Sequence, residues 1–409
     1  MRVPTIMRGP GAASPWGQRR DSAEAIRVVP VEDPLVGTVI KGTLLTLLTL
    51  GIYRFWYRTN LRRYYWSNTT ILGDGFDYSG TGRELLIGFL IMLAIFVPLN
   101  FAASLLGLFA GEQLGGVIAS VIAFFLVPAF IQVAIYRGRA YRFSRTRYRG
   151  IRFHQSGSAW GFLATTAKWL LFTALSVGLL LPYLREAMHR YRTENTLFGS
   201  LRASCMSSGK SLMKSWLPFW FMAMFAFGVL VLIGATMALS GHPGIIGIAS
   251  LLFFGAACTL PVLWQMYRVA EFRHFVETAS FGELRLASDA SARTVIWITV
   301  KFIAILVGAL VGLVALVVLA SGSGLSIDDL ESAEAAIGSM RVGFFLLPLG
   351  MLLIYAVVSE IYLRRRLWAH FLGSITLTNT NQLAAIMQRA AEDGGAFGDS
   401  FDPDFDIAG

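Results

Sequence analysis

The chain has 409 residues, of which 55% are hydrophobic and only 15% are charged, and its mean hydropathy is +0.59. About a quarter of the residues of a soluble domain are charged, so this composition excludes an ordinary soluble protein and indicates a polytopic membrane protein. The formal net charge of +10 favours anionic phospholipid headgroups over nucleic acid as partners, because basic residues of membrane proteins collect at the cytoplasmic surface.

The two ends of the chain are polar. Residues 1–34 are rich in proline, glycine and arginine and hold no apolar core long enough for a secretory signal, so they predict a disordered cytoplasmic tail. Residues 392–409 hold acidic but no basic residues and predict a second disordered tail, which is solvated, lies against basic segments or recruits a partner. One repeat-containing transmembrane domain is expected over residues 35–391.

Apolar runs follow the first tail, and a helix needs roughly 20 apolar residues to cross a bilayer core of about 30 Å. Two runs are too short for this, Gly42 to Tyr53 and Trp169 to Leu184, and each directly follows a lysine. The runs that are long enough are Leu85 to Ala110, Leu114 to Tyr136, Leu217 to Leu239, Ile245 to Tyr267, Val295 to Ala320 and Val342 to Leu363.

The two short runs and the basic segments after them match each other without a gap. At one constant offset, the matched pairs are Lys41 with Lys168, Gly51 with Gly178, Arg58 with Arg185, Arg63 with Arg190, and Asn68 with Asn195. Agreement at so many positions indicates an internal repeat. The basic segment recurs near Arg268, and weaker copies lie near Arg142 and Arg364. Partial alternation after the glycine that ends each copy predicts a short strand or hairpin arm.

The basic segments also predict topology, because short cytoplasmic loops collect lysine and arginine. If every apolar run crossed the membrane, matching basic segments would lie on opposite sides. If the two short runs instead re-enter or lie at the interface, all basic segments are cytoplasmic, and the outer loops hold one basic residue, Arg341. We therefore expect an all-α fold: six transmembrane helices in three hairpins, two short re-entrant or interfacial repeats, Arg/Tyr-rich cytoplasmic connections, and both termini in the cytoplasm.

The segment LTLGIYRFWYRTNLRRYYWSNTTILGDGFDYSGTG, which begins at residue 48, resembles the signature of the bacterial inner-membrane family known as YjgN or DUF898. The segment from Ser176 is similar to the later repeat of that family, although Arg202-Ala203-Ser204 replaces its alternating aromatic residues. The resemblance implies an inner-membrane location and this fold. It implies nothing about chemistry, because the family is uncharacterised.

Ionisable residues at membrane depth are candidate functional sites. Lys41, Lys168 and Lys301 recur near the starts of apolar runs, where they either snorkel to headgroups or bind an anionic substrate or lipid. Glu360 is the one acid inside an apolar run, and it either pairs with Arg364 at i,i+4 or couples to protons. The arginines of the collar helices are candidate phosphate ligands: Arg58, Arg63, Arg185 and Arg190.

Three classes of function are weighed against these patterns. The first is a transporter or lipid-handling permeation protein with an anion or headgroup site near the repeated lysines. The second is a non-transporting scaffold that binds anionic lipid and protein partners. An intramembrane enzyme is not expected, because the histidines are scattered and no catalytic motif is present. Cys205 and Cys258 lie far apart, so no disulfide, metal site or cofactor is expected.

Overall fold

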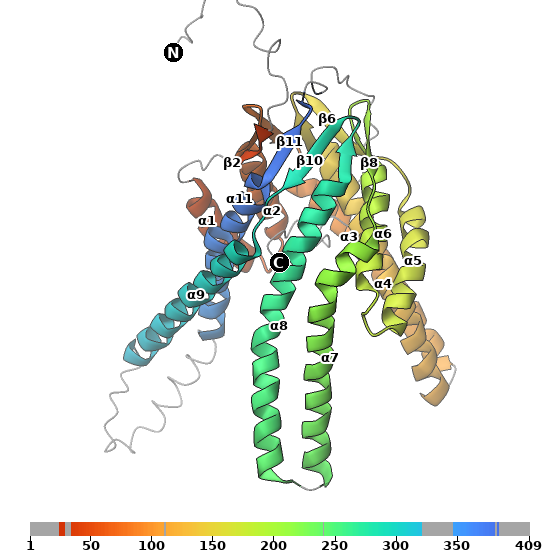
Figure 1. Ribbon diagram of the computed structural model, residues 1–409, viewed down its shortest axis with the longest axis vertical. Coiled ribbons are helices and arrows are strands. Elements are labelled where there is room, and N and C mark those ends of the chain that lie inside the picture. The colour runs from red at the N-terminus through yellow and green to blue at the C-terminus, as the bar shows by residue number, and fades with distance from the viewer. Residues whose placement is uncertain are drawn as a thin grey trace, which may run out of the picture.

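The computed structural model describes residues 24–28, 34–109, 112–239, 241–320, 347–380 and 383. Helices dominate, and they run in antiparallel pairs from one end of the molecule, where short strands gather (Figure 1). The helical elements are α1 (Pro34–Leu48), α2 (Arg54–Ser67), α3 (Gly82–Phe109), α4 (Glu112–Arg145), α5 (Ala159–Leu175), α6 (Leu181–Glu194), α7 (Gly209–Leu239), α8 (Pro243–Thr278), α9 (Ala292–Ala320), residues 347–358, the π-helix η2 (Ser359–Arg364) and α11 (Arg365–Gly373).

Each helical pair is joined to the next by a tight β-hairpin. The turns between strands use residues with positive φ, such as Gly73 (86°) and Gly150 (78°), which suit two-residue hairpin loops. The strands are β3 (Thr69–Ile71), β4 (Asp74–Tyr78), β5 (Thr146–Tyr148), β6 (Ile151–Gln155), β7 (Thr196–Phe198), β8 (Leu201–Cys205), β9 (Ala279–Phe281), β10 (Leu284–Ser288) and β11 (Ile375–Thr378). The all-α expectation is therefore incomplete, because these segments satisfy their backbone groups by pairing with one another.

The strands form a closed ring rather than an open sheet. Two short strands near the N-terminus, β1 (Glu24–Ala25) and β2 (Arg27–Val28), stand at the two ends of the strand order and are separated only by Ile26. β1 pairs with β11, with Ala25 opposite Thr376, and β2 pairs with β3. Ile26 N also donates to Ile375 O at 3.0 Å. A closed ring leaves no edge strand exposed.

The strand β1 and the strand β11 thus form an antiparallel pair, although they are separated by most of the chain. This corrects the expected boundary at residue 34, since residues 24–28 of the predicted disordered tail form strands. The expectation missed them because a few residues with a distant partner carry little local signal. The remaining predicted tail segments, 1–23, 29–33 and 392–409, lie outside the described residues.

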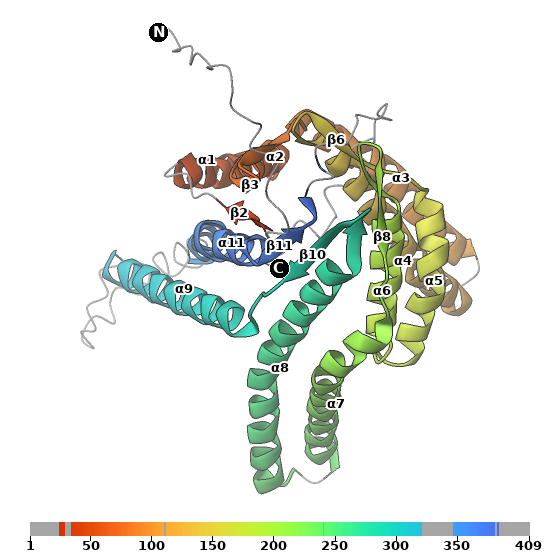
Figure 2. The same cartoon turned by 45° about the horizontal axis from the view of Figure 1, so that its top comes forward.

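The helical pairs differ in length (Figures 1 and 2). Within the described residues, five segments have the length and composition of membrane spans: Gly82–Ala102, Gly209–Leu239, Pro243–Thr278, Ala292–Val317 and Leu347–Gly373. They coincide with five of the predicted apolar runs. The sixth run, Leu114 to Tyr136, lies inside the long helix α4 but is not among these five segments. The chain is therefore a polytopic, mainly helical membrane protein.

The pairs α1–α2 and α5–α6 are short. Each pair runs away from the ring along its first helix and returns to the ring along its second. A helix of 15 residues such as α1 is about 22 Å long, less than the bilayer core of about 30 Å. The two turns share one geometry: Gly51 N donates to Thr46 O and Gly178 N to Thr173 O, both at 2.7 Å. Their tips expose apolar side chains, with Leu50 95% and Val177 65% accessible.

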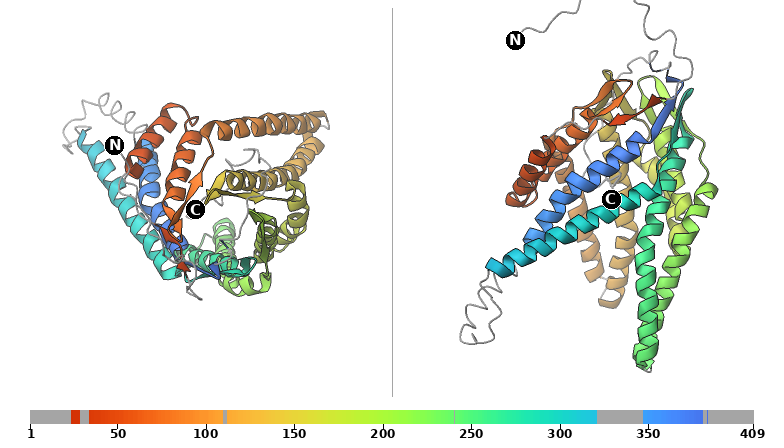
Figure 3. Two further views of the ribbon diagram at one scale, coloured as in Figure 1. Left: turned by 90° about the horizontal axis from the view of Figure 1, so that it is seen from above. Right: turned by 60° about the vertical axis from the view of Figure 1, so that its left-hand side comes forward.

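The long pairs diverge from the ring and have few neighbours in their apolar parts (Figure 3). Only 6–17% of the most apolar window of each candidate span is buried inside the protein. Helices α7 and α8 pack along each other, yet Phe225, Leu251 and Phe254 on them stay exposed. Most of the apolar surface of these helices is thus available to lipid.

Candidate functional site

An apolar cavity of about 190 Å³ lies inside the ring. It is here named the ring cavity, and its wall contains carbon-rich side chains and two threonines: Ile26, Trp66, Thr69, Phe76, Phe143, Thr146, Phe153, Trp368 and Leu372. An apolar cavity of about 150 Å³ stays dry and binds a molecule the size of benzene. The ring cavity therefore suits a purely apolar group, such as one end of an acyl chain.

Leu383 lies outside the wall of the ring cavity. It packs against two clusters of buried residues, one that contains Ile26 and Leu377 and one formed by Tyr148 and Phe198. The cavity wall instead uses residues near the ends of the incoming helices, such as Trp66, Phe143 and Leu372. The cavity therefore lies where these helices enter the ring.

The polar atoms of the cavity wall are used within the protein. Trp66 Nε1 donates to Thr146 Oγ1 at 2.9 Å, and Trp368 Nε1 donates to Thr69 Oγ1 at 3.2 Å. The two threonines donate in turn to helix carbonyl oxygens, as Thr146 does to Arg142 O at 2.8 Å. These bonds fix both indoles and leave carbon surface toward the cavity.

Two arginines stand directly behind the aromatic wall. Arg139 Cζ lies 4.6 Å from the centroid of the Phe143 ring, and Arg139 Nε donates to Gln155 Oε1 at 3.2 Å. Arg62, which is 1% exposed, donates to the Tyr78 hydroxyl at 3.2 Å. Both arginines lie one helical turn before a cavity-lining aromatic residue, Arg62 before Trp66 and Arg139 before Phe143.

Acidic side chains occupy the seams between packed helices, Glu84 between α3 and α4 and Glu271 between α6 and α8. Glu84 accepts a hydrogen bond from the Tyr141 hydroxyl at 2.6 Å and pairs with Arg145 at 3.0 Å. Glu271 accepts one from Tyr267 at 3.3 Å and lies 3.8 Å from Arg185 Nε. Each seam thus combines a carboxylate, an arginine and a tyrosine that donates to the carboxylate.

The third such seam lies between α1–α2 and η2. Glu360 is 6% exposed and pairs with Arg364, the i,i+4 partner that its spacing predicts. Tyr57 and Tyr65 lie beside it; the hydroxyls of Tyr57 and Thr43 face each other, and the buried hydroxyl of Tyr65 finds no hydrogen-bond partner among the described residues. An unsatisfied buried hydroxyl costs about 1–3 kcal/mol, so the Tyr65 hydroxyl is unusual.

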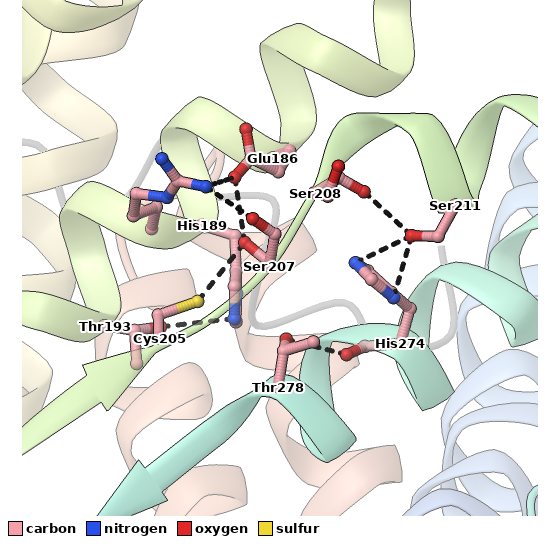
Figure 4. A network of polar contacts seen from close by, with 10 residues as sticks. Glu186, His189, Thr193, Cys205, Ser207, Ser208, Ser211, His274 and Thr278 are labelled. Atoms are coloured by element: carbon pink, nitrogen blue, oxygen red, sulfur yellow. Dashed lines mark hydrogen bonds and ion pairs between the residues drawn. The ribbon is translucent and has the colours of Figure 1, made fainter.

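A further polar network ties α6 and β8 to the start of α7, beside the end of α8 (Figure 4). Ser207 Oγ donates to Glu186 Oε1 at 2.9 Å, and Cys205 Sγ donates to Ser207 Oγ at 3.3 Å. On α8, His274 Nδ1 lies 3.2 Å from the Ser211 hydroxyl. This network lies outside the wall of the ring cavity and stabilises the contact between neighbouring helical pairs.

The three lysines singled out in the sequence do not meet. Lys41, Lys168 and Lys301 lie on α1, α5 and α9, all of them exposed, and none belongs to the wall of the ring cavity. Lys168 Nζ lies 5.6 Å from the centroid of the Trp169 ring. Exposed lysines at helix surfaces are placed for headgroup contact rather than for a shared enclosed site with Glu360.

The four collar arginines also stay apart. Arg58 and Arg185 are half-buried at matching places on α2 and α6. Arg63 is exposed and donates to Gly80 O at 2.9 Å. Arg190 pairs with Glu186 at 2.5 Å. These contacts hold the collar together, and they leave the exposed parts of the guanidinium groups at the surface.

The sequence reasoning missed the ring cavity and two of the three acid seams. Trp66, Phe143 and Trp368 come from distant segments, and only the closed ring brings them together. Glu84 and Glu271 lie at the ends of helices beside basic residues, where a carboxylate looks like an ordinary surface charge. The only available signal was the tyrosine that each seam contains, which has no fixed spacing from its acid.

Comparison with known proteins adds a family match. A family model described as "Bacterial protein of unknown function (DUF898)" matches residues 34–402. Inner membrane protein YjgN of Salmonella typhimurium is 32% identical over 115 residues, which are 27% of this chain and 26% of that protein. The match thus covers only about a quarter of that relative's length. No solved structure matches the chain.

Proposed function

The chain belongs to the DUF898 family of bacterial proteins of unknown function, and from that premise we propose a lipid-handling role in the bacterial inner membrane. In this role the ring cavity holds the apolar end of a membrane lipid. The single observation that carries the proposal is the composition of the cavity wall, which presents carbon surface where the helices enter the ring. Burying the apolar surface of a ligand in this cavity is favourable, whereas the cavity wall is not suited to a polar ligand.

The lipid enters from the bilayer between the diverging long helical pairs. Their apolar faces are exposed over most of each candidate span, so lipid chains fill the space around them. A chain end that moves up to the ring meets Trp66 and Phe143, and the guanidinium group of Arg139 lies against the Phe143 ring. Guanidinium groups suit phosphate, which favours an anionic phospholipid. The role includes no chemical conversion.

The topology that belongs to this role has six spans, cytoplasmic termini and a cytoplasmic ring. The two short helical pairs dip into the bilayer and return, which agrees with their length and with the exposed leucine at the tip of the first pair. The helical pairs and hairpins descend from one repeated unit, and the constant offset between Leu50–Gly51 and Val177–Gly178, whose φ angles nearly agree, supports this origin.

A membrane scaffold is the second candidate function, and the lysines favour it. Lys41, Lys168 and Lys301 are exposed on three different helices, and none of them lines the ring cavity. In a scaffold these lysines bind anionic headgroups and the ring holds the helical pairs apart, with no lipid inside the ring. The two candidates therefore differ in whether the ring cavity is occupied.

Filling the ring cavity is expected to remove lipid from it. The purified protein is reconstituted with a phospholipid that carries a photoactivatable diazirine near the end of one acyl chain, and cross-linked peptides are identified by mass spectrometry. Peptides that contain Phe143 and Leu372 are expected to be labelled in the wild type. In Leu372→Trp their labelling is expected to fall to background, because an indole occupies the space of the chain end.

The matched control is Leu349→Trp, the same change at a position in the same helical segment that is 37% exposed. It is expected to leave the labelling of the Phe143 peptide unchanged. Labelling that is confined to the outer faces of the spans in wild type would contradict the lipid-handling role and leave the scaffold.

A further inference from the structure

The seam at Glu360 differs from the two other acid seams in one respect. At those seams a tyrosine hydroxyl donates to the carboxylate, from Tyr141 at 2.6 Å and from Tyr267 at 3.3 Å. At the Glu360 seam the charge of the carboxylate acts on both Tyr57 and Tyr65. The Tyr57 hydroxyl faces the Thr43 hydroxyl, whereas the Tyr65 hydroxyl has no hydrogen-bond partner within the part of the chain that the structure describes.

The hydroxyls come from two helices that pack against a third element. Thr43 lies on α1 and is 8% exposed, while Tyr65 lies on α2 and is 5% exposed. Both helices pack against the segment that contains Glu360. That segment is the π-helix η2, a rare conformation that recurs at functional sites. Buried hydroxyls beside a carboxylate, one of which lacks a partner among the described residues, indicate a bound species that supplies the missing contact.

We propose that Thr43, Tyr57, Tyr65 and Glu360 form a binding site for one small monovalent cation, either Na⁺ or the proton of a hydronium ion. Hard cations take oxygen ligands, and this site offers hydroxyl and carboxylate oxygens without nitrogen or sulfur. The site is separate from the ring cavity and does not depend on lipid handling.

Arg364 and the bound cation pair with the Glu360 carboxylate alternately. Its side chain is 35% exposed, so it reaches water or a lipid phosphate when the cation takes its place beside Glu360. One positive charge then balances the carboxylate in either state, which avoids an uncompensated buried charge. The exchange couples cation binding to the position of one arginine at the surface of the collar.

The titratable groups that face Glu360 are few. Tyr57 and Tyr65 face it from α2, Arg364 faces it from its own helix, and α1 contributes the hydroxyl of Thr43. Burial, helped by the charge of Glu360, raises the pKa of both tyrosines above the usual range, so they stay neutral. Within this group the carboxylate of Glu360 is therefore the acceptor for a proton.

The test measures the melting temperature of the purified full-length protein in detergent. Increasing NaCl is compared with choline chloride at equal ionic strength, and each series is run at several pH values. A bound cation stabilises the folded state in proportion to the logarithm of its concentration above the dissociation constant. A rise with Na⁺ alone identifies Na⁺ as the ligand. A rise as the pH falls, equal in both salts, identifies the proton.

Variants decide whether the response belongs to this site. Glu360→Gln is expected to abolish it, and Thr43→Val is expected to weaken the apparent affinity about tenfold, as for one lost ligand contact. If Glu360→Gln does not fold, Tyr65→Phe is measured in its place, because it leaves the Glu360–Arg364 ion pair intact. Glu84→Gln is the matched control, since Glu84 has its own tyrosine and arginine partners. The proposal is overturned if wild type shows no response, or if Thr43→Val and Tyr65→Phe respond like wild type.

Discussion

Ile26→Asp is expected to open the ring and to give the largest loss of stability of any single substitution in the N-terminal segment. Ile26 is 8% exposed and packs against Leu284, Ile375 and Leu377. Truncating a buried aliphatic side chain costs about 2–5 kcal/mol, and a buried carboxylate adds its own desolvation. We expect a melting temperature well below that of wild type in detergent, with Ile26→Ala in between.

A pair of introduced cysteines tests whether the Ile26 variants lose stability because the ring opens or because of a general packing defect. Ala25 lies opposite Thr376 in the ladder, and directly opposite residues of antiparallel strands are within reach of a disulfide. Ala25→Cys with Thr376→Cys, in a background without the native cysteines, is expected to cross-link and to restore the melting temperature of Ile26→Ala. Ala25→Cys with Ala287→Cys is the control, since Ala287 lies one strand further on, about 10 Å away. Equal cross-linking of both pairs would show that β1 does not hold this register.

Phe162→Ala is expected to destabilise the seam between α4 and α5 by about 3–5 kcal/mol, the usual cost of truncating a buried aromatic residue. Phe162 is fully buried, and its ring lies 5.1 Å from that of Tyr136 and 5.7 Å from that of Tyr191. The removal leaves a cavity that these rings and Arg192 cannot fill. Thermal unfolding in detergent measures the effect.

Trp160→Ala is the matched control for this second prediction. It lies on the same helix two residues earlier, is 69% exposed and loses a side chain of greater volume. A surface position of this kind is expected to change the unfolding free energy by no more than about 0.5 kcal/mol. If both variants lost equal stability, α5 would not be held through the face that carries Phe162.

The helical part of the fold was predictable because its signals are local. Run length identified the segments that became α3, α7, α8, α9 and 347–373, and the Lys41 and Lys168 segments stood out because they were short. Glycines such as Gly73 and Gly150 marked the hairpin turns. Each of these features depends on residues within about 25 positions of one another.

The ring and the ring cavity were not predictable in the same way. Ring closure depends on Ile26 and Ile375, which are distant in sequence, and neither carries a motif. The cavity depends on side chains from several helical pairs that meet only after closure. Partial alternation after the glycines predicted short strands, but it held no information about which strands pair with each other. The Glu360–Arg364 pair was the exception, because its contact lies within one helical turn.

The geometry of the ring fits the proposed topology, in which the two short helical pairs do not cross the bilayer. Every pair leaves the ring and returns to it, so a short pair and a long pair both leave the next hairpin on the same side. In the α5–α6 pair the turn is held by α7, since Trp216 Nε1 donates to Gly178 O at 3.1 Å and Trp220 Nε1 to Val177 O at 3.0 Å. Backbone at membrane depth needs such partners, because lipid supplies none.

The central claim is that all the β-hairpins form one ring on the cytoplasmic side of the membrane. Single cysteines at Asp77, Ser200, Glu283 and His242, all exposed positions, are labelled in intact cells and in inverted vesicles with a membrane-impermeant maleimide. The native Cys205 and Cys258 are replaced by serine. We expect the first three positions to react only from the cytoplasmic side and His242, at the α7–α8 turn, only from outside. Labelling of Asp77 and Ser200 from opposite sides would contradict the claim, since no single ring spans a bilayer.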